Sequence, residues 1–106
     1  MSLTVLNSSV LSACGIFVLR VISLSDAKNL VKRSQVFSAI GHSATAEILS
    51  ALLEIKVFAN RIEYTQHINT TALVFKLKSR IPEGKILSRA EIEEIGYEFR
   101  ILRRLK

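Results

Sequence analysis

The apolar residues of this 106-residue chain change their spacing several times, from a period of two to the helical period of 3.6. Over 72–78 every second residue is Ala, Val or Lys, and Leu or Phe stands between them, which is typical of a strand. Over 44–54 the apolar residues Ile48, Leu49, Leu52 and Leu53 form one stripe of a helix. Both patterns in so short a chain predict strands and helices layered around one core.

The same patterns predict the order of the elements. Strands are expected over 3–6, 16–22, 61–66, 72–78 and 97–101. The strands 61–66 and 72–78 are expected to pair as a hairpin. We therefore predict one small domain over residues 1–106, of the α/β class in its α+β form, with a mixed β-sheet flanked by helices.

Three serines are expected to begin the helices, because a serine hydroxyl accepts a hydrogen bond from a free amide of the first turn. These predicted N-caps are Ser25, Ser43 and Ser88. Glu91 completes a capping box with Ser88, and Gly96 is placed to end that helix. His42 therefore lies at the N-terminus of the predicted helix, directly before its N-cap Ser43.

The charge of the chain favours an anionic partner. The chain has 15 Lys and Arg against 9 Asp and Glu, which gives a formal net charge of +6. Such a surface attracts phosphates, nucleic acid or membrane head groups, although a solvated basic face without any partner has the same composition. His42 and His67 form no ligand cluster and the acidic residues do not group, so we expect no metal and no cofactor.

Features of secreted or membrane proteins are missing. The single cysteine, Cys14, excludes an internal disulfide. The apolar run 10–24 is interrupted by Arg20 and is too short to cross a bilayer. We expect a soluble cytoplasmic protein, in the host cell if a virus encodes it, with no membrane partner.

The segment Gly41-His42-Ser43 is the first candidate site. Backbone N–H groups at a helix start are free to bind a phosphate, and Gly41 would let it approach the backbone closely. A histidine beside that phosphate can exchange protons near neutral pH. Two interpretations stay open from spacing alone: a general acid next to a phosphodiester, or a partly buried capping histidine.

Two polar segments are further candidates. In the turn 80–85, Arg80 could hold a phosphate in a bidentate contact, and Glu83 could orient Arg80 or accept a hydrogen bond from a ribose hydroxyl. Lys85 adds a second positive charge. The segment Asn7-Ser8-Ser9 could contact base edges or ribose hydroxyls. Each is equally an ordinary solvent-exposed turn.

Taken together, these segments resemble the viral ring nuclease family, the type III anti-CRISPR proteins. The matching segments are Phe37-Ser38-Ala39-Ile40-Gly41-His42-Ser43-Ala44-Thr45-Ala46, Asn60-Arg61, Ser79-Arg80-Ile81-Pro82-Glu83-Gly84-Lys85 and Gly96-Tyr97-Glu98-Phe99, together with Leu6-Asn7. The resemblance runs from about Val36 to the C-terminus, and residues 8–35 carry no specific match.

The resemblance implies a homodimer that binds cyclic tetra-adenylate and cuts it, without metal, to linear di-adenylates with a 2′,3′-cyclic phosphate. The catalytic residues that it implies are His42, Arg80 and Glu83. Substrate binding is expected at Asn7, Ser8, Ser9, Ile40, Gly41, Ser43 and Lys85. A non-catalytic basic dimer that sequesters the cyclic oligoadenylate or binds nucleic acid remains the alternative. A viral structural or duplex-DNA-binding protein is less favoured, because no recognition-helix pattern is present.

Overall fold

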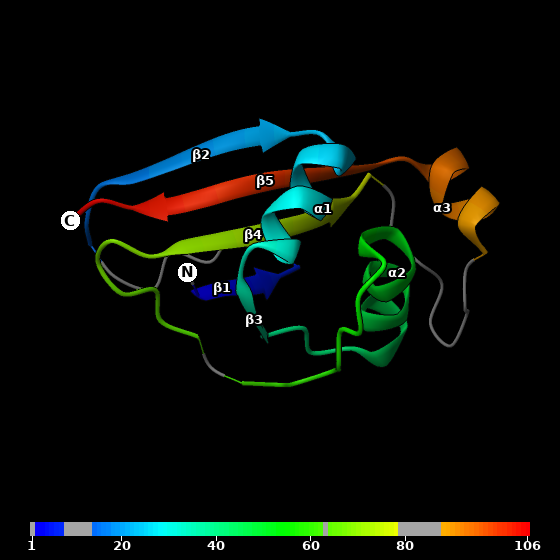
Figure 1. The fold of residues 1–106 in the computed structure, drawn as a ribbon, viewed down its shortest axis with the longest axis horizontal. Coiled ribbons are helices and arrows are strands. Elements are labelled where there is room, and N and C mark those ends of the chain that lie inside the picture. Colours follow the sequence, from blue (N-terminus) through cyan, green and yellow to red (C-terminus); the bar gives the residue numbers. More distant parts are fainter. Residues whose placement is uncertain (1, 8–13, 63, 79–87) are drawn as a thin grey trace.

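Five strands form one mixed sheet in the computed structural model, which describes residues 2–7, 14–62, 64–78 and 88–106. The strands are β1 (Ser2–Leu6), β2 (Phe17–Ile22), β3 (Gln35–Ser38), β4 (Thr71–Leu77) and β5 (Tyr97–Arg104). Their order across the sheet is β2-β5-β4-β1-β3 (Figure 1). Strand β1 is parallel to β3 and β4, whereas β5 is antiparallel to β2 and β4. The sheet thus has a parallel half and an antiparallel half.

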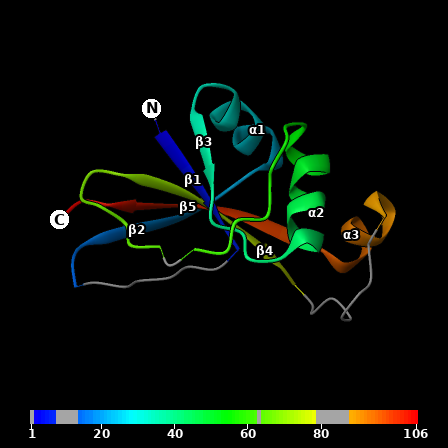
Figure 2. The same cartoon turned by 90° about the horizontal axis from the view of Figure 1, so that it is seen from below.

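Three helices complete the domain: α1 (Leu24–Lys32), α2 (Ser43–Leu53) and α3 (Arg89–Ile95). Helices α1 and α2 lie on the same face of the sheet, and α3 lies beyond its end (Figure 2). The mixed sheet with helices in one domain confirms the predicted α+β fold class. The capping box of Ser88 with Glu91 and the helix stop at Gly96 are also confirmed.

Two predicted helix starts are wrong by a residue or two. The N-cap of α1 is Ser23, whose hydroxyl accepts a hydrogen bond from the Asp26 amide (3.0 Å), so Ser25 lies inside the helix. The N-cap of α2 is His42, and Ser43 is the first helical residue.

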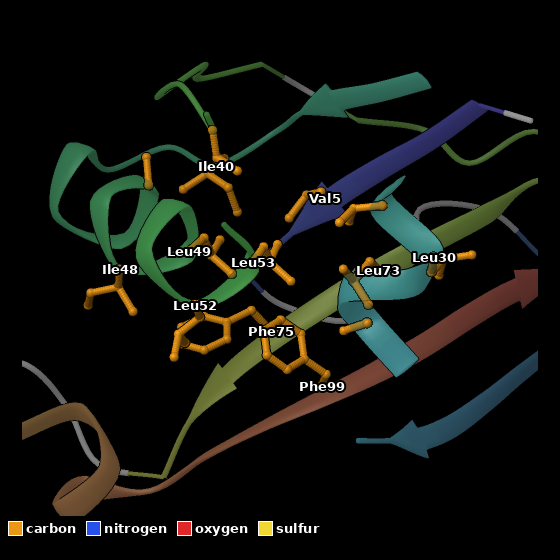
Figure 3. Close-up of a cluster of buried hydrophobic side chains, with 14 of the residues drawn as sticks. Val5, Leu30, Ile40, Ile48, Leu49, Leu52, Leu53, Leu73, Phe75 and Phe99 are labelled. Carbon is orange, nitrogen blue, oxygen red and sulfur yellow. The ribbon is translucent and has the colours of Figure 1, made fainter. Parts of the chain in front are cut away.

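The main core lies between the sheet and the two covering helices. Phe75 of β4 packs against Phe99 of β5, with ring centroids 5.3 Å apart, and Leu49, Leu52 and Leu53 of α2 close over this face (Figure 3). Strand β4 is buried on both faces over Ala72–Phe75, because it occupies the middle of the sheet. This explains why its apolar residues run on without the strict alternation of a half-exposed strand.

The predicted hairpin is wrong. The described residues of 61–66 form no strand, and the neighbours of β4 are β1 and β5. The segment between α2 and β4 passes across the sheet face opposite α1 and α2 (Figure 2), where Tyr64 packs on a second cluster of buried residues. Gln66 is buried there, and its side-chain amide donates to the carbonyl of Leu102 (2.9 Å). The alternation over 61–66 therefore reflects a segment lying on the sheet.

Within the described ranges, no helix is long and apolar enough to cross a membrane.

Candidate functional site

The carboxyl ends of β1, β3 and β4 meet at one edge of the sheet, because these strands run parallel. Asn7 directly follows β1, and the segment 39–42 directly follows β3. Val5 is paired with Ser38, and the Ala39 amide donates to the Val5 carbonyl (3.0 Å), so the two chain segments leave the sheet side by side. Ligands of open α/β sheets bind at such an edge. The fold thus brings the predicted residue Asn7 to the edge from which the segment leading to His42 departs.

The segment before His42 is held by a set of hydrogen bonds to residues 58–60. The Ser38 hydroxyl donates to the carbonyl of Phe58 (2.6 Å) and accepts from the Ile40 amide (3.2 Å). The Asn60 amide donates to the Ile40 carbonyl (2.7 Å), and its side chain donates to the Ser38 carbonyl (2.8 Å). We call this set, made by Ser38, Ile40, Phe58 and Asn60, the clip. It fixes the backbone that carries His42.

Ile40 contributes to the site through its position. Its side chain is 0% exposed and points into the core beside Leu49 and Leu53 (Figure 3). Both of its backbone polar groups are used by the clip. Ile40 thus anchors the loop on which the neighbouring residues stand, and its contact with substrate stays a prediction.

His42 is exposed at the N-terminus of α2. Its backbone is extended (φ −126°, ψ 133°), its carbonyl accepts from the Ala46 amide, and its ring makes no capping hydrogen bond. The first turn of α2 holds no acidic side chain. His42 occupies the N-cap position, as the capping interpretation expected, but it is exposed and its ring makes no capping hydrogen bond. The first turn of α2 therefore has no side-chain cap for its amides, and the residue at its start is exposed, which suits an anion.

Gly41 leaves the approach to these amides open. A β-carbon at this position would meet only Arg61 Cγ, at an ordinary contact distance of 3.7 Å, so the fold itself does not require glycine here. Arg61 Cγ therefore lies beside Gly41, and Arg61 is exposed. The sequence predicts no role for Arg61, which belongs to the Asn60-Arg61 segment of the resemblance.

Five of the predicted site residues lie outside the described residues: Ser8, Ser9, Arg80, Glu83 and Lys85. Ser43 is exposed as the first residue of α2, and Asn7 is exposed after β1. In the described part of the chain, no three His, Cys, Asp or Glu residues are grouped as a metal site would need.

Two adjoining hollows, of about 740 and 530 Å³, lie on the helix-covered face, far along the sheet from His42. Both are lined by Arg20, Leu30, Arg33 and Ile101, from β2, α1 and β5. They contain none of the predicted site residues. We take the N-terminus of α2 as the candidate catalytic site, because it combines uncapped helix amides with an imidazole, a group suited to proton transfer that neither hollow contains.

Comparisons with known proteins place the whole chain in one group. A family model described as STIV B116-like matches residues 3–99. ORF117 of Acidianus two-tailed virus is 36% identical over 93 residues, which cover 85% of this chain and 80% of that protein. YddF of Bacillus subtilis strain 168 is 33% identical over 107 residues, 99% of each chain. The structure of B116 of Sulfolobus turreted icosahedral virus is similar with a TM-score of 0.81 and 19% identity, covering 97% of this chain and 99% of that one.

Proposed function

Since this chain belongs to the STIV B116-like family and has relatives in viruses, we propose that it is a metal-independent ring nuclease that cleaves cyclic tetra-adenylate. In this role it removes the second messenger of type III CRISPR defence in the cytoplasm of the host cell. The observation that carries the proposal is the exposed imidazole of His42 beside the uncapped amides of α2.

In this reaction the protein has to position the substrate and supply a proton to the leaving group. The 2′-hydroxyl of the substrate attacks the adjacent phosphorus, the 5′-oxygen leaves, and a 2′,3′-cyclic phosphate remains. The α2 amides hold the phosphate and stabilise the charge that grows on it. Protonated His42 donates to the departing 5′-oxygen, a contribution of about 10²–10⁴-fold. The clip keeps the imidazole in place for that donation.

Arg80 and Glu83 keep the roles that the sequence predicts. Arg80 holds a phosphate oxygen, and Glu83 orients it or accepts a hydrogen bond from a ribose hydroxyl. Arg61 is added from the geometry as a second cation near the phosphate.

We propose that the active form is a homodimer. A ring of four phosphates has two-fold symmetry, and an isologous dimer has the same symmetry. Each protomer then offers one His42 to one of two opposite phosphates, which yields two linear di-adenylates. A second copy also encloses the ligand, since His42 is exposed on the single chain.

Cleavage in EDTA tests the assignment. The native chain should convert cyclic tetra-adenylate to di-adenylate, and His42→Ala should bind it but cleave at least about 10²-fold more slowly. His67→Ala is the matched control, because His67 is also exposed and its side chain makes no described hydrogen bond. Equal rates for the native chain and His42→Ala would remove His42 from the mechanism. Tight binding without cleavage by the native chain would instead establish the sequestering alternative.

A glycine variant tests where the phosphate sits. The β-carbon of Gly41→Val would meet only Arg61 Cγ, at 3.7 Å, and a urea titration checks that the variant is folded. Its branched side chain should nevertheless weaken cyclic tetra-adenylate binding by blocking the helix amides. Unchanged binding by a stably folded Gly41→Val would place the phosphate elsewhere.

A further inference from the structure

Strand β2 is an exposed sheet edge at the opposite side of the molecule from β3. It spans Phe17–Ile22 and is the outermost strand at the top of Figure 1. Its central four residues are all exposed. Within the described residues β2 pairs only with β5. Edge strands of folded proteins are normally short, charged, bulged or covered, because their free backbone groups bind other strands. Five of the six β2 residues are apolar, so this edge lacks most of those protections.

The backbone groups of β2 that face outward can be identified. The Leu105 amide donates to the Ile16 carbonyl (2.8 Å), and the Ile16 amide donates to the Lys106 carbonyl (3.2 Å). The backbone polar groups of Ile16 therefore face the chain segment that continues β5. Hydrogen-bonding direction alternates along an antiparallel strand. The backbone groups of Phe17, Leu19 and Val21 therefore point to the open edge.

The two faces of β2 differ in chemistry. On the face opposite the helices, the side chains of Leu19 and Val21 are 43% and 62% exposed. On the helix-covered face stands Arg20, whose pairing with Ile101 makes Arg103 its diagonal neighbour on β5. On that face Arg20 stands between Val18 and Ile22, so a strand added outside β2 would meet only apolar side chains on one face, and one arginine between two apolar side chains on the other.

The arginine face carries an excess of positive charge. The two adjoining hollows beside β2 are lined by four basic side chains and one acidic side chain: Arg20, Lys32, Arg33, Arg103 and Asp26. None of the ion pairs among the described residues involves these cations. Among the residues that the structure describes, the Arg33 guanidinium donates one hydrogen bond, to the carbonyl of Asn29 (3.3 Å). Arginine in such a setting suits carboxylates, which it can bind through two parallel hydrogen bonds.

We propose that the outer edge of β2 binds an extended acidic segment of a partner protein, in which acidic and apolar residues alternate. The segment adds a sixth strand by hydrogen bonding to Leu19 and Val21. Its carboxylates face Arg20 and Arg103, and its apolar side chains cover Leu19 and Val21. The local charge argues against a second copy of β2 as the occupant, because the one charged residue of this strand is Arg20 in each copy, which offers no carboxylate to the arginines. This proposal does not depend on the ring nuclease activity.

Synthetic peptides test the proposal directly. The probe is an eight-residue peptide that alternates Glu and Val, and two eight-residue controls replace Glu by Lys or group the same residues as four Glu followed by four Val. Fluorescence anisotropy should show at least about tenfold tighter binding of the alternating acidic peptide than of either control, weakening with salt. In NMR spectra of the native chain, the amides of Leu19 and Val21 should shift and exchange more slowly with solvent. No preference for the alternating acidic peptide would overturn the proposal.

Two variants separate the backbone from the charge. Leu19→Pro removes one outward amide without removing a bond to β5, and edge strands tolerate proline there. Arg20→Glu reverses the charge that faces the added strand. Each should weaken binding at least about tenfold, and Arg89→Glu, with the same charge change at an exposed site on α3, should not. Unaltered binding by both β2 variants would overturn the proposal, as would a dimer of the native chain that Leu19→Pro dissociates while the peptide fails to bind.

Discussion

The clip can be weakened by one substitution, Ser38→Ala. The Ser38 hydroxyl makes two hydrogen bonds, one to the Phe58 carbonyl (2.6 Å) and one from the Ile40 amide (3.2 Å). Alanine removes both and leaves the Ile40 amide, on a residue that is fully buried, without its acceptor. The bond from the Asn60 side chain to the Ser38 carbonyl survives, because it uses the backbone.

The expected loss follows from these two bonds. A hydrogen bond contributes about 1 kcal/mol net, so Ser38→Ala should lower the free energy of unfolding by about 2 kcal/mol. The entropy of unfolding of a domain of this size is roughly 0.2 kcal/mol per degree at the thermal midpoint, so the midpoint should fall by about 9 °C. If the clip positions His42, Ser38→Ala should lower the rate at which bound cyclic tetra-adenylate is cleaved by a larger factor than it lowers the affinity for cyclic tetra-adenylate.

Urea unfolding followed by circular dichroism measures the first effect, and single-turnover cleavage measures the second. Ser38→Thr is the matched control, because threonine keeps the hydroxyl and its branched side chain suits the end of a strand. A Ser38→Ala variant that is as stable as the native chain, or a Ser38→Thr variant that loses as much, would refute this account of the clip.

Two further substitutions test the core and a helix end. Leu52→Ala should lower the free energy of unfolding by about 2–5 kcal/mol, because Leu52 is 0% exposed and its truncation leaves a cavity under α2. A loss below about 1 kcal/mol in a urea titration would contradict this. Gly96→Ala should cost more than about 1 kcal/mol in the same assay, because residue 96 has φ 86° and an added β-carbon would lie 3.0 Å from Lys78 Cδ. Gly41→Ala is its matched control and should leave stability unchanged.

Local patterns predicted most elements because local forces determine them. The period of two over 97–101 and the capping box at Ser88 depend on neighbouring residues, and both are present in the structure. The prediction of a strand over 61–66 was wrong because it too used only the local alternation of residues. Alternation reports which side chains are buried, and Tyr64 and Gln66 are turned inward by lying across the sheet rather than by joining it.

The candidate site was predictable in its residues but only partly in its arrangement. The position of His42 at a helix start follows from the sequence, whereas the proximity of Asn7 depends on β1 and β3 being neighbours across the sheet. Strand order is set by packing between distant segments, which no local pattern contains. The clip was missed for this reason too, because its bonds join Ser38 to residues 20 and 22 positions later.

The two proposed surfaces should be separable by mutation, because they occupy opposite edges of the sheet. The strands β3 and β2 are four interstrand steps apart, which at about 4.8 Å each is about 19 Å. Effects of substitutions at this separation usually add within about 0.5 kcal/mol. The change in the free energy of unfolding caused by the double substitution Ser38→Ala/Arg20→Glu should therefore equal the sum of the changes caused by the two single substitutions. Ser38→Ala alone should bind the alternating acidic peptide as the native chain does. A coupling above about 1 kcal/mol would mean that the strands between the edges transmit strain, so that a partner on β2 could alter the placement of His42.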